Sequence, residues 1–365
     1  DNLVLSKFRE NINKDSKPIK LFAESETAQS YFCEIGFLGN EEDVVFPDSQ
    51  TIWEASSLIL TSDQPVILKW VNKQNITFLV TIKIKNDYLF TIEQQIINNS
   101  KQIISNQFYG LINRTYNEKK ENMVNISYQG FLNVTNGYLN EVSYSKIKEK
   151  KRENFKKVKL NWFGISDKYW LSAFIPDQSS SYTSNFSYGI KSGKDKYQAD
   201  FLSNLEIIQV GESKKLSHML YAGPKTLSLL DQYEKEFNIT LFDRAIDFGW
   251  FYILTKPIFY LMNFFYGYVG NFGISIMIVT VIIKLVLFSI ANKSYRSIKK
   301  IKKIQPKLER LKELYVDDKT RQNQAIMELY KEEKVNPVTG CLPLLIQIPI
   351  FFSIYTKKFD KNFNR

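Results

Sequence analysis

The feature that most limits what this chain can fold into is an apolar run of 18 residues, Ile274–Ala291, with one charged side chain, Lys284. A helix of that length matches the thickness of the hydrocarbon core of a bilayer. We therefore predict a transmembrane helix over residues 274–291. The chain has 365 residues, more than one ordinary domain needs, so we expect at least two structural units.

The excess of positive charge lies almost entirely in the C-terminal third. The whole chain has 49 Lys and Arg against 38 Asp and Glu, a formal net charge of +11. Residues 1–240 carry 29 basic and 28 acidic side chains, net +1, whereas residues 241–365 carry 20 and 10, net +10. Directly after the apolar run, Asn292–Lys303 has six Lys or Arg and no acid. The positive-inside rule places that flank in the cytoplasm and the N-terminal part outside.

Most of the N-terminal part is predicted to form one large all-β sandwich, residues 31–240. Ile82 and Ile84 alternate with Lys83 and Lys85, which indicates an antiparallel strand with one wet face. Helical periodicity is scarce before Thr226–Phe237. Residues 1–30 are polar without a sustained period, so we expect a linker. The expected strands are Val66–Val71, Ile76–Ile84, Tyr88–Ile97, Ser127–Val134, Leu171–Ile175 and Glu206–Val210.

A basic segment interrupts this β-rich region. Lys146–Lys159 holds eight basic residues and two acidic ones. It could be an anion-binding loop or a solvated connection between strands. No pattern of aromatic residues or glycines suited to binding an anion is interleaved with the charged residues, which favours the solvated connection.

A second apolar run precedes the predicted transmembrane helix. Phe248–Tyr268 has ten aromatic residues in 21 positions, is interrupted by Lys256-Pro257, and ends at a break made by Gly270, Asn271 and Gly273. Both runs could span the membrane, or the first could lie in the interface while only the second crosses. Dense aromatic side chains are typical of the headgroup level. We therefore interpret residues 241–273 as an interfacial amphipathic helix region.

Lys284 is the charge that the apolar helix has to accommodate. A lysine at the centre of a spanning helix costs about 2.5–3.5 kcal/mol on insertion scales, which makes it a candidate functional residue. Snorkelling of the ammonium group toward the interface would relieve part of that cost. Thr280 is four residues earlier on the same helix face, and its hydroxyl favours a polar pocket there.

A basic helical hairpin is predicted over residues 292–337. Ile298, Ile301, Leu308, Leu311 and Leu314 form one apolar stripe on a charged helix, and Asp317-Asp318 supplies a turn. The segment has 13 basic and seven acidic residues, net +6. It could bind ribosomal RNA, anionic lipid or an acidic protein, or it could be a solvated arm. The candidate partner-recruiting residues are Lys299, Lys300, Lys302, Lys303, Lys307 and Arg310.

The chain closes on a shorter apolar run and a polar tail. Leu342–Tyr355 has 14 residues, too few to span a bilayer comfortably. We expect residues 338–365 to be a partial transmembrane helix followed by a truncated tail.

Several blocks of sequence resemble the bacterial YidC-type membrane protein insertases of the YidC/Oxa/Alb family. Together they are very specific and cover about residues 160–355. They are Asp167-Lys168-Tyr169-Trp170, Ala173-Phe174-Ile175-Pro176, Tyr221-Ala222-Gly223-Pro224, Asp247-Phe248-Gly249-Trp250, Val269-Gly270-Asn271-Phe272-Gly273, Gln305-Pro306-Lys307, Leu329-Tyr330-Lys331, Lys334-Val335-Asn336-Pro337, Gly340-Cys341 and the run from Pro343 to Phe351.

The resemblance implies a periplasmic super-sandwich of the mutarotase type, a helical membrane core and a cytoplasmic hairpin in a bacterial inner membrane. Relative to the family, we expect the chain to be truncated at both ends. The implied function is insertion and folding of inner-membrane proteins, alone or with the Sec translocon. The implied hydrophilic groove contains Lys284, where the family usually has arginine, with Thr280 beside it and Gln347 on the next helix. The implied partners are nascent membrane proteins, lipid, the Sec translocon, the ribosome and the signal-recognition machinery, but not DNA.

Two other classes of function remain as alternatives. Sugar chemistry in the β domain would need an acid–base pair, and His218 is the only histidine, so we expect neither an enzyme nor a His-based metal site. We expect no cofactor. A membrane-tethered periplasmic binding protein or chaperone without insertase activity is the second alternative.

Overall fold

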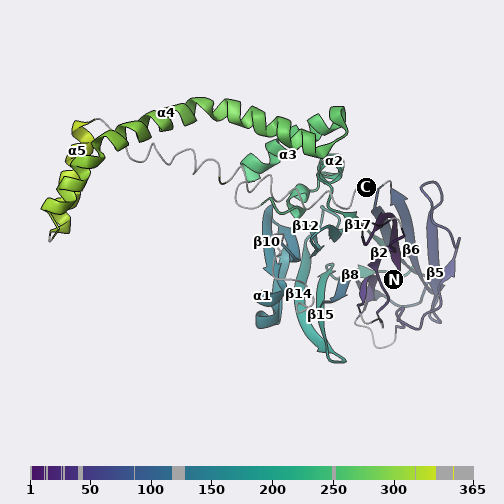
Figure 1. The fold of residues 1–365 in the computed structure, drawn as a ribbon. Coiled ribbons are helices and arrows are strands. Elements are labelled where there is room, and N and C mark those ends of the chain that lie inside the picture. The colour runs from purple at the N-terminus through teal and green to yellow at the C-terminus, as the bar shows by residue number, and fades with distance from the viewer. Residues whose placement is uncertain are drawn as a thin grey trace. The chain divides into compact units, whose positions relative to one another are not determined.

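The computed structural model describes residues 2–11, 13, 15–25, 27, 29–39, 44–85, 87–116, 128–248, 252–316, 318–333 and 348. The chain divides into two compact units, which we call the β unit, up to Asp247, and the helical unit, from Phe248 onward. In Figure 1 the purple-to-teal part of the ribbon is mostly strand, and the green and yellow part is helix.

The β unit contains seventeen strands among its described residues. They are β1 Leu3–Arg9, β2 Pro18–Phe22, β3 Tyr31–Leu38, β4 Glu54–Ala55, β5 Val66–Val71, β6 Ile76–Lys85, β7 Leu89–Asn98, β8 Ile104–Thr115, β9 Gly130–Thr135, β10 Tyr138–Ser143, β11 Arg152–Val158, β12 Leu160–Ser166, β13 Trp170–Ile175, β14 Tyr182–Lys191, β15 Lys194–Leu202, β16 Glu206–Ile208 and β17 Ser213–Pro224. Its helices are α1 Tyr144–Lys150, α2 Leu227–Phe237 and the 3₁₀ helix η2 Phe242–Ala245.

Two large antiparallel sheets make up the sandwich. The nine-stranded sheet has the order β10-β9-β12-β13-β17-β7-β6-β5-β4. The six-stranded sheet has the order β11-β14-β15-β8-β16, and β3 also pairs with β8. Strands β7 and β8 bury alternate residues, as strands with one face in a core do. Aromatic side chains such as Phe78, Phe108, Phe174 and Phe201 fill the core. The prediction of a large all-β sandwich is confirmed.

The outer face of the nine-stranded sheet is covered at its centre by α2 and η2. The Trp162 indole N–H donates to the Thr240 carbonyl at 3.0 Å, and the Phe242 ring meets the Trp162 ring edge-on at a centroid distance of 5.5 Å. Strand β12 is therefore buried on both faces, at every residue. This explains why its sequence does not alternate between apolar and polar residues, as that of a strand with one wet face does.

Most of the predicted elements are present with small shifts at their ends. Strand β5 has the predicted bounds, β6 extends one residue further, and β16 ends at Ile208 rather than Val210. Helix α2 begins at Leu227 because Thr226 is its N-cap residue. Ser127, the predicted start of β9, lies outside the described residues.

The prediction that residues 1–30 form a linker is wrong. Strands β1 and β2 pair with each other, and Leu5, Leu21 and Phe22 are buried in the core of the sandwich. The Phe22 ring also meets the Tyr31 ring edge-on at 5.3 Å. A short hairpin needs only a few apolar anchors, so it leaves no sustained period in the sequence.

The basic segment Lys146–Lys159 is not a loop. It contains most of α1, which the scarcity of helical periodicity led us to miss, and the edge strand β11. Ser143 caps α1 by accepting a hydrogen bond from the Lys146 N–H at 3.3 Å, and Tyr144 and Ile147 anchor the helix in the core. Lysines on an exposed edge strand discourage edge-to-edge pairing with other chains.

The helical unit contains α3 Tyr252–Val269, α4 Phe272–Leu314 and α5 Lys319–Glu332. The predicted break is confirmed. Gly270 has φ +66° and its N–H donates to the Tyr266 carbonyl at 2.8 Å, which closes α3. The Asn271 side chain then accepts from the Gly273 N–H at 2.9 Å and caps α4.

Helix α4 is the one helix, among the described residues, that is long and apolar enough to cross a membrane. Its length exceeds the prediction of 274–291, because it continues without interruption to Leu314. The apolar part and the first arm of the basic hairpin are therefore one continuous helix of 43 residues.

Candidate functional site

Helices α3 and α4 pack against each other. The buried face of α3 has helical spacing, with Thr255, Ile258, Phe259 and Met262. On α4 the buried positions in this region are Ser275 and Val279, one turn apart. Both helices also expose large apolar side chains, among them Ile253, Phe264, Met277 and Val281. Exposed apolar faces of this kind mark contacts with lipid or with another protein.

Lys284 lies on an exposed part of α4, beside Leu285 and Val286. In the described part of the chain it has no hydrogen bond or ion pair. Thr280 precedes Lys284 by one helical turn, so the structure places both on one side of the helix. The Thr280 hydroxyl donates to the Ile276 carbonyl at 2.7 Å and is satisfied within α4. Gln347, the third predicted groove residue, lies outside the described residues.

The end of α4 and α5 form an antiparallel helical hairpin. Ile304 and Leu308 of α4 are buried, and Ile326 and Leu329 of α5 pack against them. The Asp318 side chain caps α5 by accepting from the Arg321 N–H at 2.9 Å. Near the open end of the hairpin, the Lys307 ammonium and the Glu333 carboxylate are 2.7 Å apart. The hydrogen bond to this carboxylate raises the pKa of Lys307.

The predicted apolar stripe is largely on the covered face of α4. Leu308 and Ile301 belong to the apolar cluster that also contains side chains of α5, and Ile298 and Leu311 are half-buried. Leu314 is 70% exposed, because it is the last residue of the helix. Ile304, which sequence reasoning did not single out, is among the most buried side chains of the hairpin.

The candidate basic residues of the hairpin lie away from this apolar line. Five are exposed and have no ion pair among the described residues, whereas Lys307 is engaged with Glu333. The five are Lys299, Lys300, Lys302, Lys303 and Arg310. They give the hairpin a positively charged surface.

His218 lies in the core of the β unit and is 2% exposed. Its ring meets Phe174 and Phe201 edge-on at centroid distances of 5.4 and 5.5 Å. Burial lowers the pKa of His218 to about 3, so the imidazole is neutral at physiological pH. The neutral His218 ring is therefore part of the packed interior of the β unit.

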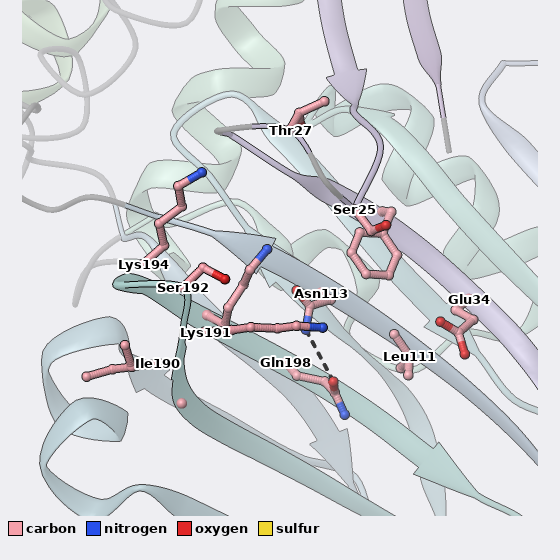
Figure 2. Close-up of a pocket in the computed structure, with 13 residues that line it drawn as sticks. Ser25, Thr27, Glu34, Leu111, Asn113, Ile190, Lys191, Ser192, Lys194 and Gln198 are labelled. Carbon is pink, nitrogen blue, oxygen red and sulfur yellow. Dashed lines mark hydrogen bonds between the residues drawn. The ribbon is translucent and has the colours of Figure 1, made fainter. Parts of the chain in front are cut away.

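A pocket that sequence reasoning missed lies on the β unit. It has a volume of about 640 Å³ and is lined by residues of β3, β8, β14 and β15 and of the segment before β3. Figure 2 shows Lys191, Lys194, Asn113 and Gln198 around it, with the last two joined by a hydrogen bond. The sequence signal that could have revealed it is the turn Ser192-Gly193 between two lysines.

Comparison with known proteins identifies both parts of the chain. The family model of the YidC periplasmic domain matches residues 1–261, and that of the 60Kd inner membrane protein matches residues 264–360. The membrane protein insertase YidC of Rickettsia akari (strain Hartford) is 57% identical over 355 residues, 97% of this chain and 63% of the relative. The protein of the same name from Rickettsia conorii is 55% identical over the same shares. The chain thus spans 63% of the length of these relatives.

Among solved structures, a galactose mutarotase related enzyme from Lactobacillus acidophilus is 9% identical, with a TM-score of 0.34 over 47% of this chain and 71% of that chain. A likeness this low says nothing of activity. The two family models, by contrast, follow each other along the chain as the β unit and the helical unit do. The chain belongs to the YidC membrane protein insertase family.

Proposed function

We propose that this chain forms the periplasmic domain and the first part of the membrane core of an insertase for inner-membrane proteins. The observation that carries the proposal is α4, a helix suited to cross the bilayer, with one ammonium group in the middle of its apolar part. Membership of the insertase family supports the same function.

In the proposed mechanism Lys284 attracts an acidic or polar segment of the substrate. Its ammonium group would lie in a hydrophilic groove, together with Thr280 and Gln347, and shorten the path of that segment through hydrocarbon. The apolar helix of the substrate then moves sideways into lipid, driven by hydrophobic partition. For charged segments the membrane potential adds about 2.3 kcal/mol per elementary charge per 100 mV. No covalent step is required.

The proposed topology places the β unit in the periplasm and the hairpin in the cytoplasm. The six basic residues of Asn292–Lys303 support this orientation. Five exposed basic side chains on the hairpin are then available to acidic partners, for which the Sec translocon, the ribosome and the signal-recognition machinery are candidates. Helix α3, with its exposed aromatic residues, would lie in the interface.

Substitution of Lys284 in the full-length protein tests the proposal. In cells depleted of their own insertase, we expect Lys284→Ala to reduce insertion of substrates with acidic outer segments. Lys284→Arg should retain activity, because arginine keeps the charge. The matched control is Lys319→Ala, which removes one positive charge from an exposed position on α5.

Normal insertion by Lys284→Ala would contradict the role of this residue. A second candidate function, a membrane-tethered binding protein without insertase activity, is favoured by the pocket on the β unit. It predicts that depletion leaves insertion intact and abolishes only ligand capture.

A further inference from the structure

The pocket on the β unit has a floor built by the register of four adjacent strands. Gln198 of β15 is the Cα partner of Asn113 of β8, and Asn113 is in turn the partner of Phe32 of β3. Along β8 and β15 the residues that alternate with Asn113 and Gln198 are buried in the sandwich core. The side chains of Asn113 and Gln198 therefore lie on the outer face of the sheet. The volume of about 640 Å³ is within the range of ligand sites.

Three lysines are gathered at one end of this floor. Lys191 of β14 and Lys194 of β15 are direct cross-strand partners beside the turn Ser192-Gly193. Lys196 follows Lys194 by two residues and therefore points to the same face. Like charges directly opposite each other in a sheet destabilise it. A cluster of this kind costs stability unless an anion binds to it.

None of the three ammonium groups has an acidic partner in the part of the chain that the structure describes. Lys196 donates to the Ser30 hydroxyl, and its pKa is lowered by burial and by Lys194 and Lys191. The acidic residue in the described lining is Glu34, which accepts a hydrogen bond from the Tyr109 hydroxyl at 2.8 Å. Three positive groups and one negative group leave the described lining at net +2.

We propose that this pocket binds an extended polypeptide segment with carboxylates at alternate positions. Alternate side chains of a strand are about 6.6 Å apart on one face, so the carboxylates of an extended peptide match the repeat of Lys194 and Lys196. The Asn113 and Gln198 side chains carry amide donors and acceptors of the kind that a peptide backbone needs. The Asn113 amide donates to the Gln198 carbonyl oxygen at 3.2 Å, and the Gln198 amide donates to the Asp200 carboxylate at 3.0 Å. One amide hydrogen on each group and the Asn113 carbonyl oxygen remain for a peptide backbone.

The uneven charge of the pocket favours a polypeptide over a uniformly anionic glycan. Lys191 and Lys194 lie beside the turn between β14 and β15, whereas Glu34 lies on β3 at the opposite side of the floor (Figure 2). A polymer with a negative charge on every unit would meet Glu34, whereas a peptide can place a neutral or basic residue there. Phe32, Leu111 and Ile190 add apolar surface for the remaining side chains. This site lies outside the helical unit and does not depend on insertase activity.

The test measures binding of a labelled twelve-residue Asp-Thr repeat peptide to the whole chain in a neutral detergent, by fluorescence anisotropy. The triple variant Lys191→Gln, Lys194→Gln and Lys196→Gln should weaken binding at least tenfold. The matched control replaces Lys69, Lys73 and Lys83 by Gln, which removes the same charge from exposed positions elsewhere on the β unit. It should leave the affinity within twofold of the unsubstituted chain.

Added salt should weaken binding to the unsubstituted chain. A Lys-Thr repeat peptide should not bind, and polygalacturonate should compete poorly. The proposal is overturned if the unsubstituted chain does not bind the acidic peptide, or if both triple variants lose affinity equally. Competition by polygalacturonate as strong as that of the peptide would instead assign the pocket to an acidic glycan.

Discussion

Arg114 and Asp167 form an ion pair at one end of the β unit, where both side chains are largely withdrawn from solvent. Arg114 is on β8 of the six-stranded sheet, and Asp167 follows β12 of the nine-stranded sheet. The guanidinium lies over the rings of Tyr31 and Tyr116 at 4.9 and 5.1 Å. The pair therefore ties the two sheets together, which gives the first residue of the block Asp167-Lys168-Tyr169-Trp170 a structural role.

Removing one partner of this pair should destabilise the β unit. We expect Asp167→Asn to lower the free energy of unfolding by about 3–5 kcal/mol, because it leaves a buried guanidinium without its counter-charge. Urea titration followed by tryptophan fluorescence measures the change. Asp63→Asn, at an exposed position, is the control. The double variant Arg114→Met, Asp167→Leu should recover much of the loss, and a double variant as unstable as Asp167→Asn would contradict this explanation.

His218 should make the β unit sensitive to acid. Its pKa is about 3 in the folded protein, below the ordinary value of 6.5, so the unfolded chain binds the proton more tightly. The stabilising contribution is therefore complete above pH 6.5 and is lost as the pH falls from 6.5 toward 3, by at most about 1.4 kcal/mol per pH unit. Urea midpoints measured between pH 4 and 7 should show this slope, and His218→Leu should reduce it. An unchanged slope in His218→Leu would exclude His218 as the cause.

The hairpin should depend on its apolar contact rather than on its ion pair. Ile304→Ala removes a buried side chain between α4 and α5, and we expect a loss of about 2–4 kcal/mol in the local stability of α5. Hydrogen exchange of the α5 amides measures it. Lys307→Ala removes only an exposed pair and should change α5 exchange little. Faster exchange in Lys307→Ala than in Ile304→Ala would reverse this ranking.

Patterns of apolar residues along the sequence predicted those strands and helices in which buried and exposed residues repeat regularly. The alternation at Ile82 to Lys85 identified β6, and the apolar run from Ile274 identified the first half of α4. Gly270 and Asn271 marked the boundary between α3 and α4, because a positive φ and an N-cap have strong residue preferences.

The missed elements depend on contacts distant in sequence. Strands β1 and β2 are held by burial of Leu5 and Leu21 in a core made by later strands. Helix α1 has only seven residues, too few to show a helical period, and is held by a cap and two buried side chains. The pocket arises because the register of β15 on β8 places Gln198 opposite Asn113, whereas the pairing of Lys191 with Lys194 follows from the two-residue turn between them. The amino-acid composition does not reveal which residues of neighbouring strands lie opposite each other.

The topology of α4 is the central claim, and protease accessibility in intact bacterial spheroplasts tests it most directly. The full-length protein carries one epitope tag in the loop at Ser62, on the β unit, and in a second version one at Asp318, between α4 and α5. If α4 crosses the bilayer as proposed, external protease removes the Ser62 tag and spares the Asp318 tag until the membrane is lysed. Protection of both tags, or digestion of both in intact spheroplasts, would contradict it.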